Sequence, residues 1–268
     1  MRVVDCHVHM YHPIENPSAL LKEMDKNGID RMIVFSRSES RSIHATRRNL
    51  MATKALFEAA PDRIGGLARI EPTLPGAASL AREALESMGF LGLKIIPDHW
   101  YAYEERLEPF WEAMNEVGAI ILFHTGILWG NEDGSRFNRP VHLEKLLFYP
   151  KVRFLMAHIS WPWCDECLAV MGRMRAAMKK HGGEWQSYID LTPGTPPYAR
   201  KQAIANALSY VGPERLLFGT DSGIPGSLGH QKEFLDWDMG IFDELGLDEA
   251  QKARIFSGNA DELFPPGR

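Results

Sequence analysis

The spacing of its apolar strands constrains the fold of this chain more than any other feature of the sequence. Short runs of apolar and β-branched residues recur every 27 to 36 residues, and each is followed by a stretch with helical periodicity. One strand–helix unit takes about 30 residues. The runs begin at Val3, Arg31, Ile64, Leu91, Ala119, Val152, Tyr188 and Leu216. Eight such units predict a (β/α)8 barrel, because parallel strands need helical crossovers and eight strands close the sheet.

Helix signals between these runs support the same architecture. Asn16 and Pro17 are typical of a helix start and Gly28 of a helix end, which predicts a helix over 17–27. The other predicted helices are 47–60, 77–88, 104–117, 141–148, 164–181, 197–211, 230–245 and 248–256. The alternative is a doubly wound open sheet, but such sheets usually carry a Gly-rich phosphate loop, and no such motif occurs here. We therefore expect one barrel domain over 1–268.

Composition argues against several classes of function. The net charge of -5 disfavours a general nucleic-acid or membrane-surface binder. No apolar run approaches the ~20 residues of a transmembrane helix. The chain enters its first strand within five residues, so no signal peptide and a cytoplasmic location are expected. The three cysteines suit a reducing compartment: we interpret Cys164 and Cys167 as packing residues and expect Cys6 to point away from its histidine neighbours.

Polar side chains stand at the ends of several predicted strands. His7 and His9 alternate along the first strand, so both project to the same face. The other residues of this kind are Lys94, His124, His158 and Asp221. In a barrel these strand ends converge on the mouth where chemistry collects. Four imidazoles and a carboxylate would lack neutral partners in an ordinary core, whereas a divalent cation satisfies them. The sequence therefore predicts a metal site at the mouth.

Several segments of the chain resemble one family in the same order. They are 24–35, 49–63, 66–72, His124-Thr-Gly126, 150–158, Phe218-Gly-Thr-Asp221 and 258–264. Together they resemble the amidohydrolase superfamily, and within it the amidohydrolase-related group that includes the aminocarboxymuconate-semialdehyde decarboxylase-like enzymes. The resemblance covers nearly the whole chain, but it is not specific for one reaction.

The resemblance implies that His7, His9, His124 and Asp221 surround a divalent metal, usually zinc, with water completing the sphere. Such a site lowers the pKa of bound water towards ~7. Asp221 would then take the proton of that water, and His158 would act beside the metal as a general acid or base. A hydrogen-bonded structural role or a second metal stays open for His158.

Two further residues are candidates for substrate binding. In binuclear relatives a lysine on the fourth strand is carboxylated and bridges two metals. We expect an unmodified Lys94 near a single ion, ~6–7 Å deeper than the strand end and with Asp221 as its nearest partner, while two ions stay open. Many relatives read Lys-x-His-Pro here, whereas this chain reads Lys-Ile-Ile-Pro over 94–97. Arg37 begins a basic cluster after the second strand and could hold a carboxylate or phosphate, or belong to a solvated loop.

Aromatic residues are frequent in the loops after strands four, five and six. They could form the wall of a pocket for a planar substrate, or pack the loops against one another. The residues are Trp100, Tyr101, Tyr103, Trp129, Trp161 and Trp163.

The combined expectation is a metal-dependent hydrolase of a small carboxylated ester, lactone or amide, acting through a metal-activated water. The alternative on the same site is a non-oxidative decarboxylase or hydratase of an aromatic-derived acid. A TatD-like nuclease is disfavoured because that group has Glu where Lys94 stands, and a non-catalytic barrel is disfavoured because every expected ligand is present. We expect a small anionic substrate and no nucleic-acid or membrane partner, with homo-oligomerisation left open.

Overall fold

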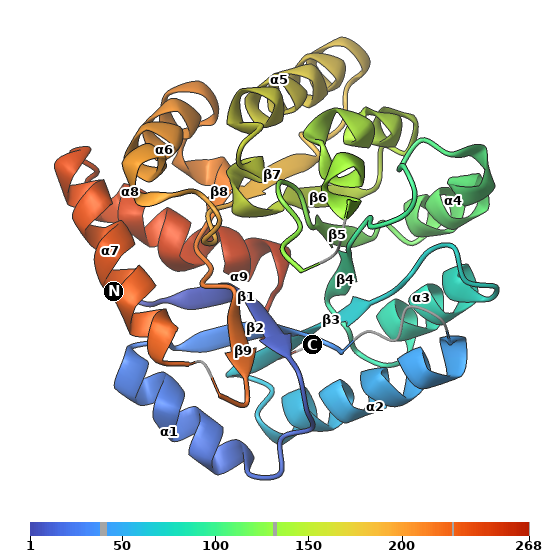
Figure 1. Cartoon of the computed structure of the whole chain (residues 1–268), viewed down its shortest axis with the longest axis horizontal. Coiled ribbons are helices and arrows are strands. Elements are labelled where there is room, and N and C mark those ends of the chain that lie inside the picture. Colours follow the sequence, from blue (N-terminus) through green and yellow to red (C-terminus); the bar gives the residue numbers. More distant parts are fainter. Residues whose placement is uncertain (38–41, 131–132, 227, 268) are drawn as a thin grey trace.

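The computed structural model describes residues 1–37, 42–130, 133–226 and 228–267. Its strands form one sheet in which every pair is parallel, in the order β8-β7-β6-β5-β4-β3-β2-β1-β9 (Figure 1). The strands are β1 Val4–Met10, β2 Arg31–Phe35, β3 Ile64–Arg69, β4 Gly92–Ile95, β5 Ile120–Phe123, β6 Arg153–Met156, β7 Ser187–Asp190, β8 Leu216–Leu217 and β9 Ser222–Ile224. This order follows the chain, as a barrel requires.

The eighth strand of the barrel is split into two pieces. β8 pairs with β7, and β9 pairs with β1. Between the pieces, the backbone N–H of Cys6 donates a hydrogen bond of 3.1 Å to the carbonyl of Phe218, so the chain from β8 to β9 closes the sheet against β1. The predicted (β/α)8 fold is confirmed, and the break within its last strand lies beside Asp221.

Helices surround the sheet on its outer side (Figure 1). They are α1 Pro17–Asn27, α2 Ile43–Ala59, α3 Ala77–Glu86, α4 Glu108–Glu116, α5 Cys164–His181, α6 Pro197–Val211, α7 Gly229–Glu244, α8 Glu249–Ala253 and α9 Asn259–Leu263. The limits of α1 match the prediction because the Asn16 side chain accepts from the Ala19 N–H at 3.0 Å and Gly28 takes a left-handed conformation with φ 75°.

Four predicted helices differ from the structure by more than two residues or in type. α2 begins at Ile43, four residues earlier than predicted, where the Ser42 side chain caps it by accepting from the Ala45 N–H. The segment Pro140–Phe148 is a 3₁₀ helix rather than an α-helix. α4 begins four residues later than predicted, because Pro109 occupies its first turn, where proline is favoured, and a 3₁₀ turn precedes it. The predicted helix 248–256 is α8 followed by a π-helical turn, Arg254–Gly258, which leads into α9.

The core has one layer inside the barrel and a larger one between the sheet and the helices. The inner layer includes Ile33, Phe35, Leu67, Leu122, Leu155 and Leu217. Cys6 belongs to this layer too, so the expectation that it points away from the histidines is wrong. The register of β1 shifts between Asp5 and Val8, and this bulge lets both Cys6 and His7 face inward.

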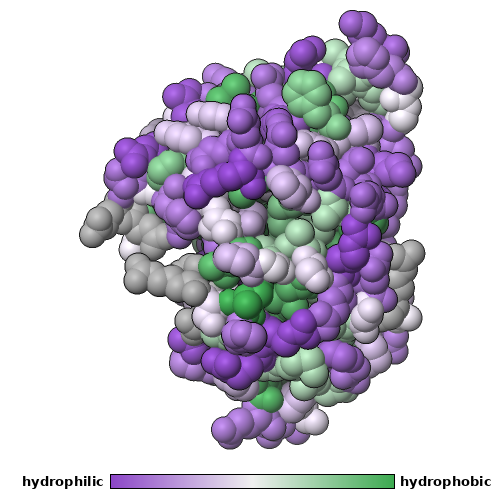
Figure 2. All heavy atoms as spheres, turned by 90° about the vertical axis from the view of Figure 1, so that its right-hand side faces the viewer, coloured by the Kyte–Doolittle hydropathy of each residue, from purple (hydrophilic) through white to green (hydrophobic). Residues whose placement is uncertain are grey.

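One face of the surface is mainly hydrophilic (Figure 2), and two of the cysteines are thiols packed on α5. Hydrophilic residues cover most of the face drawn in Figure 2, with a smaller group of hydrophobic residues near its centre. Among the described residues, no helix is long and apolar enough to cross a membrane. Cys164 and Cys167 are free thiols on α5, and burial raises their pKa values to about 11 and about 12. A protonated, buried thiol is a packing residue rather than a nucleophile.

Candidate metal centre

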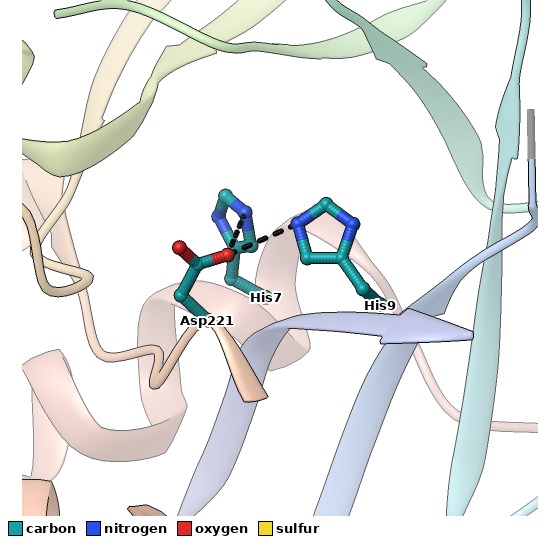
Figure 3. Close-up of side chains that lie close together, drawn as sticks. All are labelled: His7, His9 and Asp221. Carbon is teal, nitrogen blue, oxygen red and sulfur yellow. Dashed lines mark ion pairs between the residues drawn. The ribbon is translucent and has the colours of Figure 1, made fainter. Parts of the chain in front are cut away.

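Three of the predicted ligands meet at the mouth of the barrel. Oδ1 of Asp221 lies 3.2 Å from Nε2 of His7 and 3.0 Å from Nε2 of His9 (Figure 3). Potential ligand atoms of these three residues all lie within 4.8 Å of one another. The histidines come from β1, and Asp221 stands in the break between β8 and β9 with the left-handed φ of 58°. A left-handed Asp is strained, and such strain is common where a side chain must be aimed at a site.

A fourth residue, Asp190, fixes the orientation of His7. Oδ2 of Asp190, the last residue of β7, lies 2.5 Å from Nδ1 of His7, and both side chains are fully buried. Asp190 is not among the predicted site residues, although an Asp ending an apolar strand is the same signal that identifies Asp221. A carboxylate on one ring nitrogen of a histidine places the proton there, which leaves the other nitrogen able to bind a metal.

Two opposing effects, burial and the neighbouring carboxylates, set the pKa of His7. Burial lowers the pKa of His7, as does the charge of Lys94, but the carboxylates of Asp190 and Asp221 outweigh both and leave that pKa above its usual value. Burial raises the pKa of Asp221, yet the neighbouring His7 and His9 hold it well below its usual range. The two carboxylates, Asp190 and Asp221, thus stabilise a protonated His7, and His7 and His9 stabilise an ionised Asp221.

His9 offers a neutral ring to the centre. Burial lowers its pKa to about 4, against the opposing effect of Asp221. Tyr11 stacks on the His9 ring with the two centroids 6.2 Å apart and the planes 9° from parallel. Metal coordination requires an unprotonated imidazole nitrogen, so both the pKa and the position of His9 suit a ligand.

Lys94 reaches the same centre from β4. It is fully buried, with Nζ 3.3 Å from Nε2 of His7 and 4.9 Å from the centre of the Phe35 ring. The expectation of an inward-facing lysine is met, but its nearest partner is His7 and not Asp221. Burial lowers the pKa of Lys94 to about 7, while the carboxylates of Asp190 and Asp221 raise it.

His124 and His158 form the opposite side of the mouth. Nδ1 of His124 lies 3.2 Å from Nε2 of His158, and Nε2 of His124 lies 3.2 Å from the carbonyl of Ile127. His124 is therefore not in the compact group of three, and its role as fourth ligand stays a prediction. The His158 ring centroid is 5.2 Å from that of His7, and burial lowers the pKa of His158 to about 4.

The backbone at the end of β6 is shaped to present His158. His158, Ile159 and Ser160 all have positive φ angles, of 60°, 48° and 57°. Nδ1 of His158 lies 2.6 Å from the carbonyl of Pro193 and 2.9 Å from Oγ1 of Thr192. A Cβ on Gly194 would stand 3.0 Å from Cβ of His158, so any other residue there would push against the His158 side chain.

A small cavity of about 40 Å³ opens beside these residues. Its lining is His124, Ile127, Trp129, His158, Trp161, Pro193, Gly194 and Asp221. Of the six aromatic residues considered in the sequence, two therefore line the cavity. The others pack: Trp100 lies against Trp111, Tyr101 and Tyr103 against His142, and Trp163 against Arg139.

Arg37 is placed less favourably than expected. It is exposed, two residues beyond the end of β2, and part of the predicted basic cluster, 38–41, lies outside the described residues. Its role in substrate binding stays a prediction.

The donor set fits a divalent cation. Two imidazole nitrogens and a carboxylate oxygen converge, and the second nitrogen of His7 is held by a buried carboxylate, as in many metal sites. A second group, Glu71, Asp98 and His99, also brings three such atoms within 4.8 Å, and its members range from buried to exposed. The fold and the first group together define a (β/α)8 enzyme fold with a histidine–carboxylate centre at the C-terminal ends of its strands.

Comparisons with known proteins identify the family. The Amidohydrolase family model matches residues 4–265, so the chain belongs to this family, whose members bind divalent metals. A search of curated proteins finds no match.

Solved structures with the same fold cover the chain from end to end. The 5-carboxyvanillate decarboxylase from Sphingomonas paucimobilis has a TM-score of 0.73 at 15% identity and covers 99% of both chains. A 2,6-dihydroxybenzoate decarboxylase from Rhizobium has a TM-score of 0.72 at 17% identity, over 98% of this chain and 99% of its own. A 5-carboxyvanillate decarboxylase from Novosphingobium aromaticivorans, at 15% identity, a TM-score of 0.71 and coverage of 98% and 96%, was crystallised with manganese and a nitrobenzoic acid. At these identities the likeness shows the fold.

Proposed function

We propose that the protein is a metal-dependent, non-oxidative decarboxylase of an aromatic-derived carboxylic acid. This is the alternative of the sequence analysis rather than its first expectation. The observation that carries it is the full-length likeness to decarboxylases of carboxylated and hydroxylated benzoic acids, combined with an aromatic-lined cavity next to the histidine–carboxylate centre.

His7, His9 and Asp221 are the proposed ligands of one divalent cation, with His124 as a candidate fourth ligand. When bound, the cation would polarise and orient the oxygens of the substrate. Imidazole and carboxylate donors suit several divalent ions. Zinc is the ion expected from the sequence, and manganese is the ion named for one similar structure.

The chain's own residues handle the proton. Decarboxylation breaks the bond between the ring carbon and the carboxylate, leaves the electron pair on that carbon, and requires a proton there. His158 and Asp221 both line the cavity, so we assign the proton transfer to this pair. Trp129 and Trp161 would stack against the planar ring and exclude water.

Hydrolysis of a carboxylated ester, lactone or amide is the second candidate. It is favoured by the position of Asp221 within 3.2 Å of both histidines, where an ionised carboxylate can accept a proton from a water molecule in the site.

The two functions are separated by their products. Protein reconstituted with zinc or manganese is incubated with hydroxylated benzene mono- and dicarboxylates and, separately, with carboxylated lactones and esters. We expect release of one CO₂ for each acid consumed, and loss of this activity in an Asp221→Asn variant. Lactone or ester cleavage without CO₂ release would establish hydrolysis instead.

A further inference from the structure

Arg69 is a second cation that points into the barrel mouth, one strand away from Lys94. It ends β3, two residues after Leu67, which belongs to the inner layer, so Arg69 faces the same way. In the sheet, Arg69 is the direct partner of Lys94 on β4. Parallel neighbours lie about 4.8 Å apart, so the two basic side chains start side by side in the sheet.

The guanidinium group of Arg69 has unused donors. It donates no hydrogen bond to, and forms no ion pair with, any residue that the structure describes, whereas its backbone N–H donates to Oγ of Ser36 at 2.9 Å. An arginine offers five N–H donors in a fork that matches a carboxylate. The backbone is thus fixed while the charged end stays open for a ligand.

The nearby carboxylates already have other donors. Glu71 and Asp98 raise the pKa of Arg69 against the larger, opposing effect of burial, which shows that they lie near it. Oε1 of Glu71 accepts from the N–H and Oγ1 of Thr73 at 3.0 and 2.6 Å, and Oδ1 of Asp98 is bonded to Nδ1 of His99. They moderate the charge of Arg69 without occupying its fork.

Tyr11 connects Arg69 to the metal centre. Its ring stacks on the ligand candidate His9, and its hydroxyl interacts with the charges of both Arg69 and Asp221. Arg69 ends β3, whereas His158 lies just after β6, so β4 and β5 separate the two residues around the mouth. The cavity at His158, of about 40 Å³, is far below the roughly 300 Å³ of a typical ligand pocket, so a ring bound there must extend across the mouth.

We propose that Arg69 binds a second carboxylate of the substrate, one that the reaction retains, and that the substrates are therefore aromatic dicarboxylic acids. This inference rests on the proposed decarboxylase function. A carboxylate that leaves as CO₂ loses its charge, so pairing it with an arginine would stabilise the ground state more than the transition state and slow the reaction. A retained carboxylate keeps its charge throughout, and a bidentate pair with Arg69 then orients the ring.

The test measures binding rather than turnover. The probes are benzene-1,3-dicarboxylate and 3-carbamoylbenzoate, which differ only in the charge of one group. Binding to metal-loaded protein is followed by the intrinsic tryptophan fluorescence of the chain, to which Trp129 and Trp161 at the cavity contribute. We expect the wild type to prefer the diacid by about 10–100-fold, as for a charge-assisted hydrogen-bonded pair.

Four variants locate this preference. Arg69→Met should abolish it while leaving the affinity for 3-carbamoylbenzoate within about twofold, and Arg69→Lys should restore part of it as a point charge. Arg173→Met, an exposed arginine on α5, is the matched control and should keep the preference. Arg37→Met tests the other arginine near the mouth.

Three outcomes would overturn the proposal: an unchanged preference in Arg69→Met, its loss in Arg37→Met instead, or an equal loss of affinity for both probes in Arg69→Met. The last outcome would mark Arg69 as a structural counter-charge for Glu71 and Asp98. CO₂ release by the wild type is measured separately, so failure of the decarboxylase function is distinguishable from failure of this binding role.

Discussion

Replacing Asp190 by Asn tests whether a buried carboxylate prepares His7 for the metal. Asp190 accepts from two donors, Nδ1 of His7 through one oxygen at 2.5 Å and the N–H of Thr192 through the other at 2.6 Å. Asn has one acceptor oxygen and one NH₂ group, so it can satisfy only one of these donors. If the Thr192 bond persists, the amide presents N–H to His7, whose proton must move to Nε2, the atom that faces Asp221.

The size of the effect follows from that change of tautomer. A protonated Nε2 cannot bind a metal, and loss of such a supporting partner typically weakens metal affinity by about 10–100-fold, or about 1.4–2.7 kcal/mol. The assay is a chelator competition that gives the metal Kd of wild type and variant at the same pH. Thermal unfolding with excess chelator reports any loss of stability that is independent of metal.

A matched control separates the tautomer from general damage. Asp238 is also fully buried and pairs with Arg200, with Oδ2 2.6 Å from Nη2, away from the centre. Asp238→Asn should lower the unfolding temperature of the metal-free protein without changing the metal Kd. An Asp190→Asn protein with the wild-type Kd would refute the reasoning, because His7 would then keep its tautomer without the carboxylate.

Four further predictions use the same protein. Elemental analysis should find about one divalent ion per chain in the wild type and none in the double variant His7→Ala, His9→Ala. An equal metal content in the double variant would refute the assignment of these histidines as ligands. His158→Asn should keep the metal while turnover falls roughly 10²-fold or more, and full activity would make His158 structural. Lys94 should remain unmodified in an intact-mass spectrum recorded with bicarbonate present, and a carbamate with two ions would contradict this. Burial raises the pKa of Cys164 to about 11, so its alkylation at pH 8 should be about 100-fold slower than that of a free thiol. The alkylation rate should rise about tenfold per pH unit up to pH 10, and a rate independent of pH would be inconsistent with this.

The sequence predicts the fold well because its signals are local and repeated. The start of α1 at Pro17 and its end before Gly28 need only a cap, a proline and a glycine. What the sequence misses is set by tertiary contacts: the 3₁₀ form of Pro140–Phe148, and the break between β8 and β9, where Asp221 leaves the extended conformation. A strand that reads as continuous from Leu216 to Asp221 is interrupted so that its last side chain can meet those of β1.

The sequence predicts the part of the candidate site that depends on which residues end the strands. It misses the part that depends on strand register and on which side chains contact one another. His7, His9 and Asp221 converge because parallel strands end at one mouth. Arg37 is named from the sequence because a basic cluster is visible there. Arg69 is not named, because the inward face of β3 depends on the strand register. The ring nitrogens of His124 face His158 and the carbonyl of Ile127, contacts that a pattern of residue types cannot indicate.

In the segment Asp5-Cys6-His7-Val8-His9, Asp5 has a structural role beside the candidate ligands His7 and His9. The bulge in β1 sends His7 into the barrel and Asp5 to the outer side, where it accepts from Gln231 of α7 at 2.9 Å. Asp5 also accepts from the N–H and Oγ1 of Thr220 at 3.0 and 2.6 Å, and from the N–H of His7 at 3.2 Å. Thr220 directly precedes Asp221, whose left-handed conformation costs of order 1–3 kcal/mol and persists only if its surroundings enforce it. The buried Asp5 carboxylate thus accepts from the backbone N–H of Thr220, just before the proposed ligand Asp221, and from that of His7, another proposed ligand. This explains how the Asp-x-His-x-His segment and the Thr-Asp pair act as one unit although 215 residues separate Asp5 from Thr220.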